Sequence, residues 1–256
     1  MEAILAKETN FDEKLLELSA EIDAFEGYTY AHGLRIAAIA DAIGKSFNLA
    51  AHDRNFMQQA ALIHDIGELA MNRDYIKQGR PLSAAERMDM QRHPVIGEQE
   101  AAKRGFSRGV QLLVRWHHEW WNGTGYPDAL EGEQIPLAAR ILRVADSFAA
   151  LRDDRPRRKA MSVAEARVYL TDWTGLEFDP KVVKAFLDSE YIDSLEVEKL
   201  TVAELQPAPM ELEEVPNREL PPVEAKLPSE PAVSSPPLLE TAPADEQPLS
   251  RSITNE

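Results

Sequence analysis

Five of the six histidines in this chain form a spaced series, and the fold must accommodate them. The series consists of His32, His64, His93, His117 and His118. Two carboxylates accompany it: Asp65 follows directly on His64, and Asp146 lies in an otherwise apolar segment. A carboxylate is costly to bury unless it is paired or binds a cation. We therefore expect the fold to gather these side chains at one place.

These seven residues are of the types that bind transition metals. Neutral imidazoles and carboxylates together suit borderline-to-hard metal ions, and one tetrahedral zinc ion needs only four ligands. The excess favours two metal ions side by side, roughly 3.5–4 Å apart, an arrangement used to attack phosphate esters. The chain has no cysteine, which excludes disulfides, zinc knuckles and iron–sulfur clusters.

Simpler interpretations apply to single residues of this kind. A lone histidine on a helix is usually a surface residue or a hydrogen-bonded core residue, and His52 keeps that interpretation. The two dipeptides of the series, His64-Asp65 and His117-His118, favour metal binding because they occur together in a histidine-poor chain. Asp146 alone could instead pair with a nearby arginine, Arg140 or Arg143.

The first 200 residues show helical periodicity almost throughout and no alternating strand pattern. Gly67 is suited to end one of these helices, and the segment 119–136, with its glycines and prolines, is predicted to be a loop. Another helix is expected to open at His93. The remaining helices are predicted at residues 11–22, 28–47, 52–65, 83–91, 109–118, 137–151, 162–170 and 180–189.

The C-terminal part of the chain differs in composition from the rest. Residues 201–256 hold 11 of the 17 prolines, with 11 acidic and 3 basic residues, a net charge of −8. Such a segment buries too little apolar surface to offset its ordering entropy. We predict an N-terminal helical extension at 1–24, a catalytic domain at 25–198, and a disordered acidic tail at 199–256. The tail is either a linker or a peptide ligand for a partner protein.

Charge and hydropathy restrict the location and the partners. The net charge of −16 argues against a sequence-independent DNA binder. The first 25 residues lack the basic and apolar regions of a secretory signal. No apolar run reaches the roughly 18–20 residues of a membrane span. We expect a cytoplasmic protein that does not interact with membranes.

Four segments together resemble the HD-GYP domain, the long-motif branch of the HD phosphohydrolases. They are His64-Asp-Ile-Gly67, His93-Pro-Val-Ile-Gly97, His117-His-Glu-Trp-Trp-Asn-Gly-Thr-Gly-Tyr-Pro127 and Ala139-Arg-Ile-Leu-Arg-Val-Ala-Asp-Ser-Phe-Ala-Ala-Leu151. The resemblance continues through Arg155-Pro-Arg-Arg-Lys-Ala160 and Phe178-Asp-Pro180. It implies an all-α fold, an HD-type helical bundle that holds the metal site.

The resemblance also implies an activity. Family members are iron- or manganese-dependent phosphodiesterases that hydrolyse cyclic di-GMP, a bacterial second messenger. We expect two metal ions and a metal-bridging hydroxide that opens the ring to give pGpG. By resemblance, one metal is held by His32, His64, Asp65 and Asp146, and Asp65 bridges to a second held by His93, His117 and His118.

Substrate contacts are implied in the same way. The Gly-Tyr-Pro loop would place Tyr126 against the ligand, and Gly123 and Gly125 would let the backbone approach without a Cβ clash. Arg155 and Arg158 match basic positions that contact the nucleotide. The planar fork of arginine suits phosphate oxygens and guanine edges.

The sequence departs from the family pattern at two positions. Glu68, which we place with Asp65 at the catalytic centre, replaces a lysine that faces the phosphate. Reversing a unit charge about 4 Å from a phosphate oxygen turns roughly 4 kcal/mol of attraction into similar repulsion at an effective dielectric near 20. Alternatively, Glu68 turns outward, with Arg73 or Lys77 supplying positive charge.

The second departure concerns a third metal ion. Trinuclear members of the family carry a glutamate one turn before the first histidine of the series. Tyr28 occupies that position here, which favours two metals. The alternative is that Glu26 or another carboxylate moves in to bind a third.

Two other functions stay open. A degenerate domain could bind a nucleotide or a signalling partner without turnover, which fits the charge change at Glu68. An intact enzyme could instead act on another phosphate ester. The complete ligand set favours the cyclic di-GMP phosphodiesterase.

Overall fold

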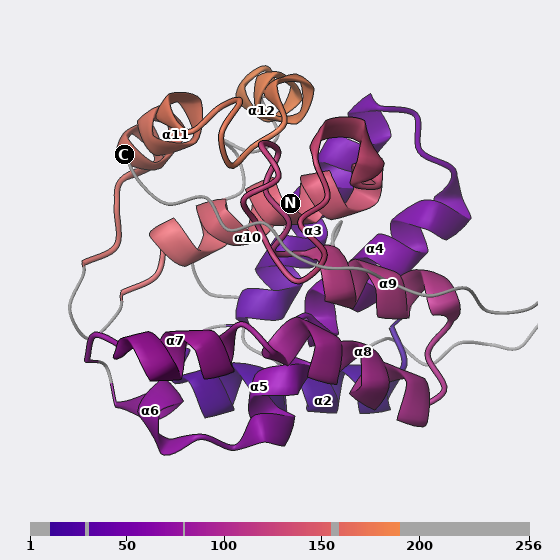
Figure 1. Ribbon diagram of the computed structural model, residues 1–256. Helices are drawn as coiled ribbons and strands as arrows, with labels where there is room; N and C mark the ends of the chain where they lie inside the picture. Colours follow the sequence, from indigo (N-terminus) through magenta and orange to yellow (C-terminus); the bar gives the residue numbers. More distant parts are fainter. Residues whose placement is uncertain (1–10, 29–30, 79, 155–158, 190–256) are drawn as a thin grey trace, which may run out of the picture. The chain divides into compact units, whose positions relative to one another are not determined.

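The computed structural model describes residues 11–28, 31–78, 80–154 and 159–189 (Figure 1). Within these ranges all regular structure is helical, apart from two isolated bridges, Asn122 with Glu131 and Thr174 with Phe178. The all-α prediction is confirmed. Arg155, Arg158 and the tail at 199–256 lie outside the described residues, and the predicted domain boundaries stay predictions.

The order of elements follows the predicted one with three additions. The short helices α5 and α6 and one 3-10 turn were not predicted. The elements are α2 (Glu13–Glu26), α3 (His32–Ser46), α4 (Ala51–Ile63), α5 (Ile66–Met71), α6 (Asp74–Lys77), α7 (Ala84–Met90), α8 (His93–Lys103), α9 (Arg108–Trp116), the 3-10 turn η1 (Gly132–Gln134), α10 (Leu137–Leu151), α11 (Val163–Asp172) and α12 (Pro180–Leu187).

Three helices form the centre of the described fold. Helix α3 packs against α4 and α10, and α4 also packs against α9 (Figure 1). Their contact faces are aliphatic, with Ile36, Ile63 and Ile141 almost completely buried. Burying such a side chain contributes about 1.5–3 kcal/mol. A rigid apolar centre therefore supports the polar residues that these helices also carry.

Gly67 does not end a helix, contrary to the prediction. Helix α4 already ends at Ile63, and Gly67 lies inside α5. A Cβ at this position would lie 2.0 Å from the carbonyl oxygen of His93 and 2.8 Å from the amide nitrogen of Gly97. The residue is glycine because the backbones of α5 and α8 touch there, and not because the chain needs a left-handed turn.

The break between α4 and α5 contains the first dipeptide of the series. His64 closes α4, and Asp65 precedes α5 with φ −101° and ψ 20°. This sparsely populated backbone region is common for active-site residues. The break removes the constraint of a continuous helix, in which adjacent residues diverge by about 100°. The two neighbouring side chains can therefore serve one site.

The segment after α9 is a loop, as predicted, and hydrogen bonds hold it in place. Glu119, which is buried, accepts from the amide of Asp128 at 2.7 Å and from that of Leu130 at 3.0 Å. The carboxylate of Asp128 in turn accepts from Arg115 and Trp116 of α9. The loop is thus fixed to the helix that precedes it.

Among the described residues, no helix combines the length and the apolar character needed to cross a bilayer.

Candidate metal centre

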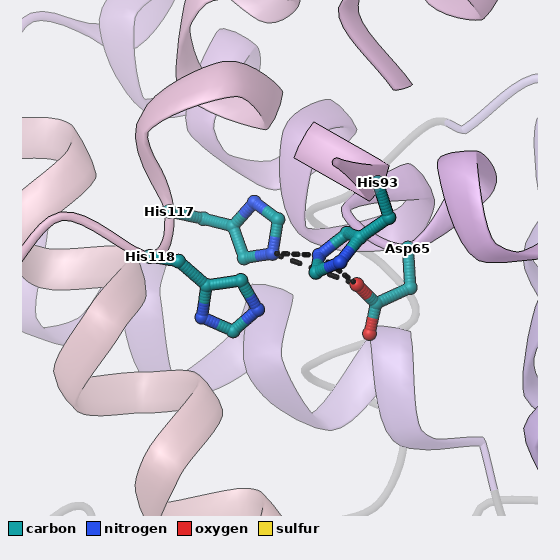
Figure 2. A group of neighbouring side chains, drawn as sticks. All are labelled: Asp65, His93, His117 and His118. Atoms are coloured by element: carbon teal, nitrogen blue, oxygen red, sulfur yellow. Dashed lines mark hydrogen bonds and ion pairs between the residues drawn. The ribbon is translucent and has the colours of Figure 1, made fainter. Parts of the chain in front are cut away.

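The first group of potential metal ligands joins three helix ends. It consists of Asp65 before α5, His93 at the start of α8, and His117 and His118 after α9. One nitrogen or oxygen atom of each residue lies within 4.8 Å of the others. Asp65 Oδ1 is 3.1 Å from His93 Nε2 and 3.5 Å from His117 Nε2. Figure 2 shows these side chains pointing toward one another.

The second group lies next to the first. His32 at the start of α3, His64, and Asp146 on α10 again bring ligand atoms within 4.8 Å of one another. His32 Nε2 is 3.6 Å and His64 Nε2 is 4.0 Å from Asp146 Oδ1. His64 Nε2 is also 3.0 Å from Asp65 Oδ2. Asp65 therefore stands between the two groups.

Hydrogen bonds on the outer side orient the imidazoles. His64, His93 and His117 each pair Nδ1 with the main-chain carbonyl three residues earlier, at 2.9, 2.8 and 2.6 Å. His32 Nδ1 lies 3.0 Å from the carboxylate of Asp153. A proton on Nδ1 satisfies each contact and leaves the Nε2 lone pair for a cation, the usual support of metal-binding histidine.

Unsatisfied atoms at the centre show that the residues fit metal ions. His32 Nε2, His64 Nε2 and Asp65 Oδ1 are buried and have no hydrogen-bond partner among the described residues. The nearby carboxylates are within ion-pair distance but are not aligned for hydrogen bonds. Leaving a buried polar atom unsatisfied costs about 1–3 kcal/mol. Cations at the two groups would satisfy all three atoms.

The electrostatics of the site agree with this. Although burial raises it, the pKa of the Asp65 carboxyl is held well below its ordinary value by His64, His117 and His93. Burial lowers the pKa of His64, but Asp65 and Asp146 raise it well above the ordinary value. Without metal, a proton on His64 therefore balances part of the negative charge, and a metal ion would displace it.

His118 differs from the other histidines of the series. Its Nδ1 accepts a hydrogen bond from Nη1 of Arg143 at 2.9 Å. Burial, helped by His117 and Arg143, lowers its pKa well below the ordinary value, so the imidazole is neutral at pH 7. The Arg143 guanidinium is fixed on its other side by the carboxylate of Glu177.

A cavity of about 290 Å³ opens beside the two groups. Asp65, His118 and Asp146 contribute to its wall, together with Arg143 and Glu68. Other lining residues include Glu26, Tyr28, Ile76 and Met90. The wall of the cavity is thus predominantly polar and includes potential metal ligands, with a smaller apolar and aromatic part.

The alternative that Glu68 turns outward is wrong. Its residue surface is only 9% exposed, and it lines the cavity. Arg73 is paired with Asp89, and Lys77 lies over the ring of Phe25. Burial and the charge of Asp65 raise the pKa of Glu68 to about 8. In the metal-free site the carboxyl is therefore mostly protonated at neutral pH, and the repulsion expected for a full charge is reduced.

A third group of carboxylates involves Glu26. Oxygen atoms of Glu26, Asp65 and Glu68 lie within 4.8 Å of one another. The alternative that Glu26 reaches the metal ligands is thus compatible with its position. Tyr28 stacks on the ring of His32, with 3.8 Å between the ring centroids.

The predicted substrate residues are only partly described. Tyr126 packs against His118, with ring centroids 4.9 Å apart, and burial raises the pKa of its hydroxyl. A Cβ on Gly125 would lie 2.2 Å from the amide nitrogen of Trp120. Glycine there permits the loop to fold on itself. Roles for Arg155 and Arg158 stay predictions.

Several residues around the site were missed by the sequence analysis. Arg143 was considered only as a partner of Asp146, which it is, at 3.2 Å. Glu177 and Asp153 were not singled out. Spacing could have identified Arg143, which lies one turn before Asp146. Asp153 lies in a stretch of mixed acidic and basic residues, a composition typical of a solvent-exposed segment. No local sequence pattern therefore indicated its contact with His32.

Comparison with known proteins shows the family to which this chain belongs. The family model of the HD domain matches residues 12–182. RpfG of Xanthomonas campestris, a cyclic di-GMP phosphodiesterase response regulator, is 35% identical over 177 residues, 68% of this chain and 47% of the relative. The 3′3′-cGAMP-specific phosphodiesterase 3 of Vibrio cholerae is 33% identical over 164 residues, 64% of this chain and 36% of the relative. The chain thus spans less than half of each.

Solved structures agree on the fold. The crystal structure of V-cGAP3, a cyclic GMP-AMP-specific phosphodiesterase of V. cholerae, matches with a TM-score of 0.57 at 23% identity. The match covers 71% of this chain and 50% of that one. Bd1817, an HDG"Y"P protein from Bdellovibrio bacteriovorus, matches with a TM-score of 0.53 at 20% identity, over 73% of this chain and 61% of that one. The chain therefore belongs to the HD domain family, and it is of the HD-GYP type.

Proposed function

We propose that this protein is a metal-dependent phosphodiesterase that hydrolyses cyclic di-GMP to pGpG in bacterial signalling. The observation that supports this most directly is the pair of ligand groups that meet at Asp65. They leave buried polar atoms unsatisfied beside a cavity. Relatives that act on cyclic dinucleotides support the substrate class.

The proposed cofactor is a pair of transition-metal ions, iron or manganese. His32, His64 and Asp146 would hold one, and His93, His117 and His118 the other, with Asp65 shared. When bound, such a pair polarises a phosphate oxygen and makes a water molecule acidic enough to be a nucleophile near pH 7. Nitrogen and oxygen donors without thiolate suit these metals.

Side chains in and around the cavity would bind and orient the substrate. Glu68 lies in the cavity wall, and its carboxyl group can donate a hydrogen bond to a phosphate oxygen only while it is protonated; bound cations favour its ionised form. Tyr126 limits the space beside His118, and its hydroxyl stays protonated. Arg155 and Arg158 are proposed to contact the nucleotide from outside the described residues. These contacts hold the phosphorus in place for in-line attack.

The test of this function is metal analysis together with product analysis. Protein purified without oxygen should contain two iron or manganese ions per chain and convert cyclic di-GMP to pGpG, resolved by chromatography. The same assay with 3′3′-cGAMP decides between the two substrates of the relatives. GMP as the main early product would contradict two-metal chemistry, and one tightly held zinc ion would contradict the ligand assignment.

A receptor without turnover is the second candidate, and Glu68 at the position of the usual lysine is the observation that favours it. Full metal loading with unchanged cyclic di-GMP and 3′3′-cGAMP, but with measurable binding of either, would establish it. Signalling would then be expected to pass to a partner protein that binds the tail. Binding of that partner can be measured with a peptide of residues 199–256.

A further inference from the structure

Arg143 on α10 connects the two groups of metal ligands. Its Nη1 donates to His118 Nδ1 at 2.9 Å and to Asp146 Oδ2 at 3.2 Å. His118 belongs to one group and Asp146 to the other. Its Nε donates to Glu177 at 2.9 Å, and Nη2 also contacts that carboxylate. The guanidinium is thus held at one edge by Glu177 and presents its other edge to the site.

The hydrogen bond to His118 is not compatible with a metal ion on that imidazole. A neutral imidazole has one nitrogen that carries a proton and one that offers a lone pair. If a metal ion takes the lone pair of either nitrogen, the other carries the proton and no acceptor is left. An arginine N–H always donates. Metal binding at His118 therefore releases the Nη1–H of Arg143 that points to it.

The charged groups in the cavity wall indicate what the released N–H of Arg143 would bind. Its wall contains the carboxyl groups of Glu26, Asp65, Glu68 and Asp146. Within the described part of the chain, Arg143 is the only arginine or lysine that lines it. A phosphodiester has a negatively charged oxygen, and arginine donates to such oxygens in a fixed planar geometry. With Glu177 holding the other edge, Nη1 keeps its position when His118 is released.

We propose that Arg143 binds the scissile phosphate. Metal loading frees Arg143 for this role, because a metal ion on His118 removes the hydrogen-bond acceptor of Nη1. The proposal rests on the proposed function for the identity of the phosphate ester. It predicts an order of events, metal first and substrate second, and it supplies the cation that the cavity lacks at Glu68.

The decisive measurement is phosphate binding with and without metal. Arg143→Lys keeps the positive charge but cannot hold Glu177 and donate to the site together. Calorimetry with orthophosphate and with a phosphorothioate analogue of cyclic di-GMP would be done on manganese-loaded and on chelator-treated protein. In the loaded form, Arg143→Lys should bind both probes at least about tenfold more weakly than wild type, the scale of one charge-assisted hydrogen bond. In the metal-free form the two proteins should bind orthophosphate equally.

Arg140→Lys is the matched control. Arg140 lies one turn earlier on α10 and pairs with the buried Asp179, but it does not line the cavity. This variant should bind both probes like wild type. Equal affinities of loaded Arg143→Lys and wild type would overturn the proposal. So would a loss explained entirely by lower metal content, because Arg143 would then only position His118.

A second variant protects the test against misfolding. Arg143→Met leaves Glu177 buried without its partner, a change that is strongly destabilising in general. Arg143→Met with Glu177→Leu removes both charges and should give the same loss of affinity at unchanged metal content. If wild type binds the analogue but hydrolyses no cyclic dinucleotide, the proposed function fails and Arg143 is still tested. If it turns over the substrate and Arg143→Lys binds normally, only the present inference fails.

Discussion

Replacing Glu68 by glutamine should stabilise the metal-free protein, and the effect should grow with pH. Glu68 is buried beside Asp65, with an oxygen 3.9 Å from His93 Nδ1. Burial and the charge of Asp65 raise its pKa from 4.5 to about 8. Glutamine has nearly the same shape and no charge at any pH. The substitution therefore removes the cost of ionising this group and leaves the packing of α5 unchanged.

The size and sign of the stability difference follow from the pKa shift of Glu68. The folded pKa exceeds the ordinary value by 8 − 4.5, about 3.5 units, and each unit is about 1.36 kcal/mol. A raised carboxyl pKa stabilises the fold fully below pH 4.5, and this contribution is lost as the pH rises through 8. Relative to wild type, Glu68→Gln should thus be neutral near pH 4.5 and more stable by on the order of 3–5 kcal/mol at pH 8.5.

Urea unfolding in the presence of a chelator, repeated between pH 4.5 and 8.5, measures this difference. Glu17→Gln, at an exposed position of α2, is the control and should follow wild type at every pH. Adding manganese should reduce the advantage of Glu68→Gln, because nearby cations favour the carboxylate. Parallel stability curves for wild type and Glu68→Gln would refute the reasoning, since Glu68 would then be ionised in the fold without cost.

Three further predictions, the first with a control variant, concern the metal ligands, the phosphate contact and the packing at Gly67. His64→Ala should remove metal and activity together, whereas His52→Ala, with its exposed side chain, should change neither; similar behaviour of the two would contradict the ligand assignment. Glu68→Lys should raise kcat/KM by at least about tenfold, equivalent to roughly 1.4 kcal/mol, and no gain in an active, metal-loaded enzyme would mean that another cation already holds the phosphate. Gly67→Ala should destabilise the fold by about 1–3 kcal/mol or more because its Cβ would collide with the carbonyl of His93; thermal unfolding with an unchanged midpoint would exclude this contact.

The gathering of the seven His and Asp residues was predictable because histidine is rare in this chain and two dipeptides of the series lie at helix ends, while their role as metal ligands stays a prediction. The orientation of Glu68 was not predictable, since it depends on α5. That helix has only six residues, too short for a periodic pattern, and Gly67 reads locally as a helix end. The reason for glycine there, contact with the backbone of α8, is a tertiary one. The partnership of Arg143 with Glu177 likewise joins residues 34 positions apart, which no local pattern indicates.

The outer hydrogen bonds of the histidines have a consequence for how the centre is assembled. His64, His93 and His117 each use a carbonyl of their own helix or of the turn before it, so each ring is aligned by local backbone alone. These three side chains are therefore arranged before any ion arrives. A metal site built in this way could be emptied and refilled without refolding. Which ion it held in the cell would then reflect the metal available there as much as the protein's own preference.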